Sequence, residues 1–227
     1  MRRGRQSAGH TAIRRAWLAL FLVLSGSALG ARAEVVDRIV ATVNRRAILA
    51  SEWDEAVRFE CLLNGRRLQD VTSDDRLATL QRLIDQELIT EQMRASSFVP
   101  ATPEEVAARV SELRQTAPAW RTDDGWRAAL AASGLTEEDA EERTTIQLNV
   151  LRYLDLRFRP EVHVDRRAME NYYREQLLPE MRTAGWSDVP FEQVAPKIEQ
   201  LLIEQQLNEL QDRWVRGLRL QADVQVR

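Results

Sequence analysis

Pairs of neighbouring carboxylates are the residues of this chain whose types and spacing could do chemistry. Two adjacent acidic side chains can divide the roles of general acid and general base between them, and such pairs stand at Asp74-Asp75, Asp123-Asp124 and Glu137-Glu138. Each pair follows a threonine or serine that could cap a helix, and acidic side chains in the first turn complement the helix dipole. We therefore interpret the three pairs as helix starts rather than as catalytic centres.

The other candidates for chemistry are single residues. Cys61 is the only cysteine, and His163 is the only histidine after residue 33. A zinc site or a Cys-His or Ser-His catalytic site would have to be built from these two side chains, and zinc-ligand spacing is absent. We expect Cys61 to fill an apolar core, with pairing between two chains as the alternative. No glycine loop of the phosphate-cradling kind occurs, so we expect no metal, no cofactor and no enzymatic activity.

Residues 1–33 carry the three parts of a secretory signal peptide in the expected order. An arginine-rich segment over residues 2–15 precedes an apolar segment over residues 17–24, and Ala31-Arg32-Ala33 fits an A-x-A cleavage site. Cleavage after Ala33 predicts an exported, periplasmic chain. The alternative is an uncleaved anchor, but the apolar run is well short of the ~20 residues that a membrane-spanning helix needs.

The charge of the predicted mature chain disfavours nucleic acid as a partner. Without the six arginines of residues 1–33, the remaining 194 residues hold 26 basic and 35 acidic side chains, a net charge of −9. Binding to a phosphate backbone favours a basic face. We also expect no stable membrane insertion after the signal peptide is removed.

The first element after the signal peptide is a predicted β-hairpin over residues 36–49. Apolar and polar residues alternate up to Val43, Asn44 suits the left-handed conformation of a tight turn, and a short second strand follows Arg45-Arg46. The arginine pair raises the question of an anion site. No helix amino terminus or glycine loop is expected to face it, so we interpret the pair as an exposed turn.

The rest of the chain predicts a mainly α fold. Residues of the capping type mark the expected helix starts, which are Ser51, Thr72 or Ser73, Thr102, Thr122, Thr136 and Asp165. Residues 179–190 are expected to be irregular, and a last long helix is expected over residues 191–218.

Apolar side chains indicate what these helices pack against. In the helix that starts at Thr136 they predict strong burial, at Ile146, Leu148, Val150, Leu151, Leu154 and Phe158. The last helix has an apolar stripe that needs a partner surface along much of its length. Val224 and Val226 alternate like a strand, and because so short a strand cannot stand alone, we expect it to join the hairpin in a small sheet.

These segments resemble a known family. "VDRIVATVNRRAILASEWD" and "LQRLIDQELITEQM" look like the amino-terminal module of the SurA-type periplasmic chaperones, which is related to the chaperone modules of PrsA and trigger factor. "LDLRFRPEVHVDRRAMENYYRE" and the segment from "PFEQV" to "QADVQV" extend the resemblance over nearly all of residues 34–227. It implies a helical chaperone domain over residues 34–164, with residues 165–227 packing back on it.

One departure from the family matters for function. Relatives carry parvulin rotamase domains between the "NYYRE"-like and "PFEQV"-like helices, but here only sixteen residues separate Tyr173 from Pro190. The resemblance therefore implies an ATP-independent holding chaperone without isomerase activity. Its implied clients are unfolded exported proteins, outer-membrane β-barrel precursors above all.

A holding chaperone needs a partly apolar surface rather than a reactive residue. Large apolar side chains at expected helix ends and loops are our candidates for client contacts, with core packing as the alternative for each: Phe98, Trp120, Trp126, Leu178 and Trp186. Two other functions remain open, a non-catalytic subunit that binds one envelope partner and a degenerate prolyl isomerase.

Overall fold

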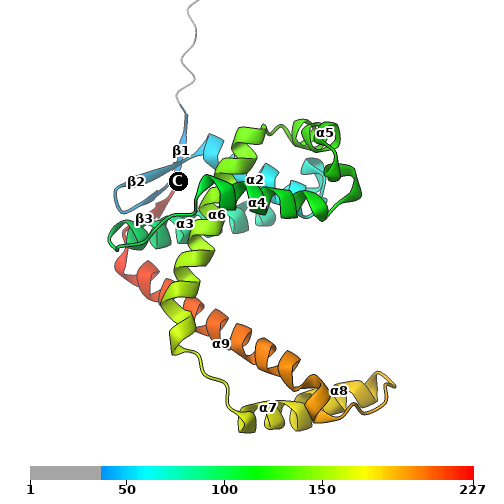
Figure 1. Cartoon of the computed structure of the whole chain (residues 1–227). Coiled ribbons are helices and arrows are strands. Elements are labelled where there is room, and N and C mark those ends of the chain that lie inside the picture. Colours follow the sequence, from blue (N-terminus) through cyan, green and yellow to red (C-terminus); the bar gives the residue numbers. More distant parts are fainter. Residues whose placement is uncertain (1–36) are drawn as a thin grey trace, which may run out of the picture. The chain divides into compact units, whose positions relative to one another are not determined.

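The computed structural model describes residues 37–227. The predicted signal peptide and its cleavage site after Ala33 lie outside these residues. Helices dominate the described part of the chain, and a small antiparallel sheet completes it (Figure 1). The predicted mainly α fold with a small sheet is therefore confirmed.

The sheet joins segments from the two ends of the described chain. Strands β1 (Ile39–Val43) and β2 (Arg46–Leu49) form the predicted hairpin, and β3 (Val224–Val226) pairs with the other edge of β1, giving the order β2-β1-β3. Asn44 takes the left-handed conformation at the turn, with φ of 52°. Its backbone N–H donates to the carbonyl of Asp223 over 2.7 Å, and its side-chain oxygen accepts from the Asp223 N–H over 3.0 Å.

Helix α2 (Ala50–Leu63) begins one residue before the predicted cap. Leu49 occupies the N-cap position without a side-chain hydrogen bond, so the assignment of Ser51 as the cap was wrong. The hydroxyl of Ser51 instead donates to the carboxylate of Asp37. The hairpin leads directly into the helix, and the Ala50 N–H at its start donates to the carbonyl of Arg38 over 2.7 Å. The helix ends at Asn64-Gly65, with Gly65 at φ of 60°.

Four of the following helices begin at the predicted threonines. Thr72, Thr102 and Thr136 each form a capping box with the acidic residue three positions later, at the starts of α3 (Ser73–Arg94), α4 (Pro103–Gln115) and α6 (Glu137–Phe158). Thr122 caps α5 (Asp123–Ser133). The three carboxylate pairs lie in first turns, as interpreted from the sequence.

Beyond α6, Asp165 caps α7 (Arg166–Tyr172), which continues through a π-helical turn (Tyr173–Leu177) into α8 (Leu178–Thr183). The expectation that residues 179–190 are irregular was wrong for residues 179–183. Pro179 comes directly after the π-helical turn, and because proline has no N–H it cannot donate to a carbonyl of that turn. Helix α9 (Phe191–Gln221) then runs from α7 to α3 and leads into β3 (Figure 1).

Three apolar clusters hold these elements together. The first joins the hairpin to α2 and α3, and the second joins α2 to α5 and the start of α6. In the third, Ile89 of α3, Leu154 and Phe158 of α6, and Leu207 of α9 pack together. The second half of α6 therefore packs against both α3 and α9, which also contact each other.

The strong burial predicted for α6 is wrong in part. Leu154 and Phe158 are buried, but the side chain of Leu151 is 58 % exposed, and Ile146, Leu148 and Val150 are half-buried. Helices α3 and α9 cover only part of the apolar surface of α6. The uncovered part forms the floor of two pockets.

Candidate functional site

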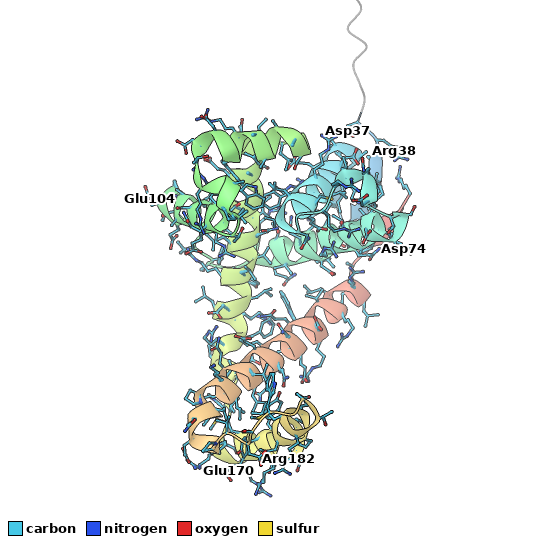
Figure 2. All side chains as sticks on the ribbon, turned by 90° about the vertical axis from the view of Figure 1, so that its right-hand side faces the viewer. Asp37, Arg38, Asp74, Glu104, Glu170 and Arg182 are labelled. Atoms are coloured by element: carbon cyan, nitrogen blue, oxygen red, sulfur yellow. The ribbon has the colours of Figure 1, made fainter. Side chains whose placement is uncertain are left out.

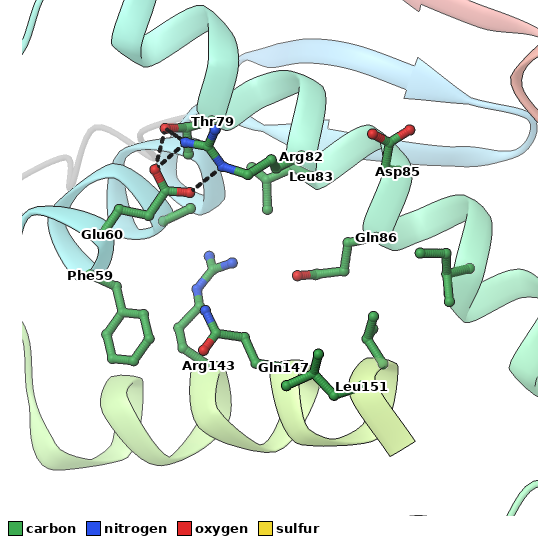
Figure 3. Close-up of a pocket in the computed structure, with 13 residues that line it drawn as sticks. Phe59, Glu60, Thr79, Arg82, Leu83, Asp85, Gln86, Arg143, Gln147 and Leu151 are labelled. Atoms are coloured by element: carbon green, nitrogen blue, oxygen red, sulfur yellow. Dashed lines mark hydrogen bonds and ion pairs between the residues drawn. The ribbon is translucent and has the colours of Figure 1, made fainter. Parts of the chain in front are cut away.

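The first pocket lies among α2, α3 and α6 and has a volume of about 330 Å³ (Figure 3). We call it the α2–α3–α6 pocket. Its apolar surface comes from all three helices, as Ala56, Phe59, Leu83, Ile89, Val150 and Leu151. Phe59, Leu83 and Ile89 also belong to the buried clusters, so the apolar wall of the pocket is continuous with the core.

Charged side chains around this pocket are already paired within the fold. Glu60 accepts hydrogen bonds from Arg82, with 2.8 Å from Nε to Oε1, and from the hydroxyl of Thr79 over 2.7 Å. The hydrogen bond to Glu60 raises the pKa of Arg82 above its ordinary value. Figure 3 shows this group together at one side of the pocket.

Arg143 forms another part of the wall and is only 6 % exposed. Its Nε donates to Oε1 of Glu55 over 2.6 Å, and its Nη2 donates to the carbonyl of Glu52 over 2.7 Å. Both acceptors are on α2, so this arginine fastens α6 to α2 beside the pocket.

A third charged contact connects the pocket with α9. Asp85 lines the pocket, and its Oδ1 accepts from Nε of Arg219 over 2.5 Å. The guanidinium of Arg219 also donates to the side-chain and backbone oxygens of Gln81, over 2.6 and 2.9 Å. All three guanidinium nitrogens therefore bind α3, which holds the end of α9 in place.

A second pocket, of about 570 Å³, lies between α6 and α9. We call it the α6–α9 pocket. Leu148, Leu151 and Leu207 give it apolar surface, and polar side chains from both helices complete its lining. Leu151 lines both pockets, so its exposed side chain connects them across α6. The pair of pockets can hold apolar groups against a surface that stays open to water.

The residues proposed from the sequence as client contacts lie elsewhere, and none of the five lines either pocket. Trp126 is 3 % exposed and packs edge-on against Trp120, with ring centroids 5.7 Å apart, in the cluster that contains Phe59. It is therefore a core residue in this structure, on the face of α5 that also buries Leu130.

The other candidates are distributed over separate parts of the fold. Phe98 follows α3 and packs edge-on against Tyr153 of α6, with centroids 5.7 Å apart. Leu178 is half-buried at the start of α8, and Trp186 is exposed just after α8. These side chains do not form one common surface with Trp120.

The apolar residues of α6 indicate the pockets in the sequence, whereas the candidates at expected helix ends and loops do not. Ile146, Leu148, Val150 and Leu151 cover more of the circumference of α6 than one core-facing stripe requires. Such a surplus indicates a helix with apolar partners on more than one side. Which part of the surplus stays uncovered depends on where α3 and α9 pack, and helix periodicity does not contain that information.

The remaining chemical groups of residues 37–227 are placed as follows. No cluster of three or more His, Cys, Asp or Glu side chains suited to a metal ion occurs among them. Cys61 is buried, and burial raises the pKa of its thiol. Asp74 and Glu104, in the first turns of α3 and α4, lie well apart at the surface in Figure 2. None of the helices in the described part has the length and hydropathy of a membrane span.

No family model matches this chain, and no curated protein matches it.

Proposed function

We propose that this protein is an ATP-independent holding chaperone of the periplasm, which binds extended segments of unfolded exported proteins. Outer-membrane β-barrel precursors are the proposed clients. The signal-like residues 1–33 and the resemblance to the SurA-type chaperones support the compartment and the class of client. We further propose that the protein does not act as a prolyl isomerase.

The observation that carries this proposal is the position of Leu151. An exposed leucine on α6 lies at the junction of two pockets whose surfaces are largely apolar. Apolar contact of this kind is non-directional, so it accepts many different sequences. The paired charges of Glu60, Arg82 and Asp85 around it keep the surface solvated when no client is bound.

Holding also requires weak and reversible binding. Burying one leucine-sized side chain contributes roughly 1.5–3 kcal/mol when burial is complete. An open site that buries a few such groups, after the cost of ordering an extended segment, would bind in the micromolar range or weaker. Clients could then dissociate without nucleotide hydrolysis.

The test is to replace Leu151 by aspartate and compare it with Leu156→Asp. Leu156 is 65 % exposed on the same helix and lines neither pocket, so it is a matched control. A urea-unfolded outer-membrane β-barrel protein is diluted into buffer with each variant, and its aggregation is followed by light scattering. Leu151→Asp should weaken holding about tenfold or more, because one apolar contact is lost and a charge is desolvated. Leu156→Asp should hold like the unmodified protein.

Two results would overturn the proposal. One is that the unmodified protein does not suppress aggregation at all. The other is that both aspartate variants hold the client equally well, which would remove the pockets from the function. Circular dichroism of each variant establishes that the helices are intact, since neither leucine is a core residue.

A further inference from the structure

Two glutamine side chains extend into the α2–α3–α6 pocket from opposite helices. Gln86 comes from α3 and Gln147 from α6 (Figure 3). Within residues 37–227 neither side-chain amide takes part in a hydrogen bond, and no buried polar side-chain atom lacks a partner. The two amides are therefore accessible to solvent and available to a ligand.

The charged residues that line the pocket offer a ligand nothing comparable. Glu60 is paired with Arg82, Asp85 with Arg219, and Arg143 with Glu55. A charged side chain entering the pocket would lose hydration without meeting an unpaired charge of opposite sign. The electrostatic character of the pocket thus favours an uncharged occupant.

An amide side chain is suited to one such occupant in particular. It carries both a hydrogen-bond donor and an acceptor, which match the C=O and N–H of a peptide unit. In an extended peptide, successive side chains point to opposite sides. One side chain can therefore enter the apolar pocket while the main chain beside it remains at the level of Gln86 and Gln147.

We infer that the α2–α3–α6 pocket binds an uncharged apolar side chain of an extended polypeptide, and that Gln86 and Gln147 hold the peptide main chain at its mouth. The inference rests on the proposed function and adds to it a rule for selecting segments. Main-chain contacts are independent of sequence, whereas the pocket rejects charge. Segments with alternating apolar and small polar residues are preferred to segments with a charged residue at the same position.

The experiment measures binding of a fluorescein-labelled, uncharged eight-residue peptide of alternating leucine and serine by fluorescence anisotropy. Three related peptides are compared: one with a central leucine replaced by lysine, one with it replaced by glutamate, and one N-methylated at the central peptide bonds. The protein variants are Gln86→Met, Gln147→Met and their combination. Methionine keeps the length and helix propensity of glutamine but removes both hydrogen-bonding groups.

We expect each methionine substitution to weaken binding of the unmodified peptide about two- to tenfold, the range given by one net hydrogen bond. N-methylation should weaken binding to the unmodified protein by a similar factor but should have little effect on the double variant. The lysine and glutamate peptides should both bind at least about tenfold more weakly than the leucine peptide. Gln205→Met, at an exposed position of α9 that lines neither pocket, is the control and should bind like the unmodified protein.

The outcomes separate this inference from the proposed function. If Leu151→Asp weakens peptide binding while both glutamine variants and N-methylation leave it unchanged, the inference fails and the holding function stands. If neither Leu151→Asp nor the glutamine variants affect binding, both fail. If the peptide does not bind and sedimentation shows a concentration-dependent dimer that Leu151→Asp abolishes, the pocket belongs to a second copy of the chain, which also overturns the inference.

Discussion

Replacing Arg143 by methionine should destabilise the fold because it removes one member of a buried ion pair between α6 and α2. Loss of one partner from a fully buried pair costs about 3–5 kcal/mol. The side chain of Glu55 is 30 % exposed, so its carboxylate can recover part of its hydration, and we expect about 2–3 kcal/mol. For a chain of this size, this corresponds to a fall in Tm of roughly 5–10 °C.

The assay is urea unfolding followed by circular dichroism at 222 nm, for Arg143→Met, Glu55→Gln and the double variant. The two substitutions should be coupled by about 1–2 kcal/mol, because each removes the partner of the other. Arg109→Met is the control, since Arg109 and Glu112 form an exposed pair within α4 and its removal should cost less than about 1 kcal/mol. A loss below about 1 kcal/mol for Arg143→Met, or additive single effects, would refute the reasoning.

Three further substitutions test other parts of the fold. Leu154→Ala should cost about 2–4 kcal/mol in urea unfolding, because Leu154 is 7 % exposed, whereas Leu156→Ala should cost less than about 1 kcal/mol. The hydrogen bond from Arg66 holds the pKa of Asp75 well below its usual 3.8. Asp75→Asn should therefore destabilise at pH 7, and the difference should shrink as the pH falls below about 4, because protonation removes the stabilisation; an unchanged difference at pH 2.5 would contradict this. Gly134→Ala should cost about 1 kcal/mol or more, since φ is +69° and a Cβ would lie 2.6 Å from an arginine nitrogen; an unchanged Tm would show that the turn can relax.

The parts of the fold that depend on local chemistry could be predicted from the sequence. Thr72, Thr102 and Thr136 cap helices because their partners stand three residues later in the same segment. Asn44 and Gly134 adopt the left-handed conformation that their residue types favour. These signals involve only a few neighbouring residues, so they survive any tertiary arrangement.

The features that the sequence did not predict depend on distant partners. Ser51 has the right chemistry for a cap, but its hydroxyl binds Asp37, fourteen residues earlier. Leu151 and Leu154 are identical residues one helical turn apart, yet only Leu154 is covered by α9 and α3. The candidate site depends on that difference, which is why the large apolar side chains at expected helix ends and loops do not coincide with it.

The position of β3 beside β1 also sets an order of events in folding. A hairpin of neighbouring strands such as β1 and β2 can form within microseconds. The contact between Asn44 and Asp223 spans 179 residues, so it must await both the synthesis of that segment and the docking of α9. Until then the edge of β1 has unpaired backbone groups, which are a template for pairing with other chains. Pairing with β3 thus covers the free edge of β1 late in folding and leaves only the three-residue β3 as the edge strand on that side of the sheet.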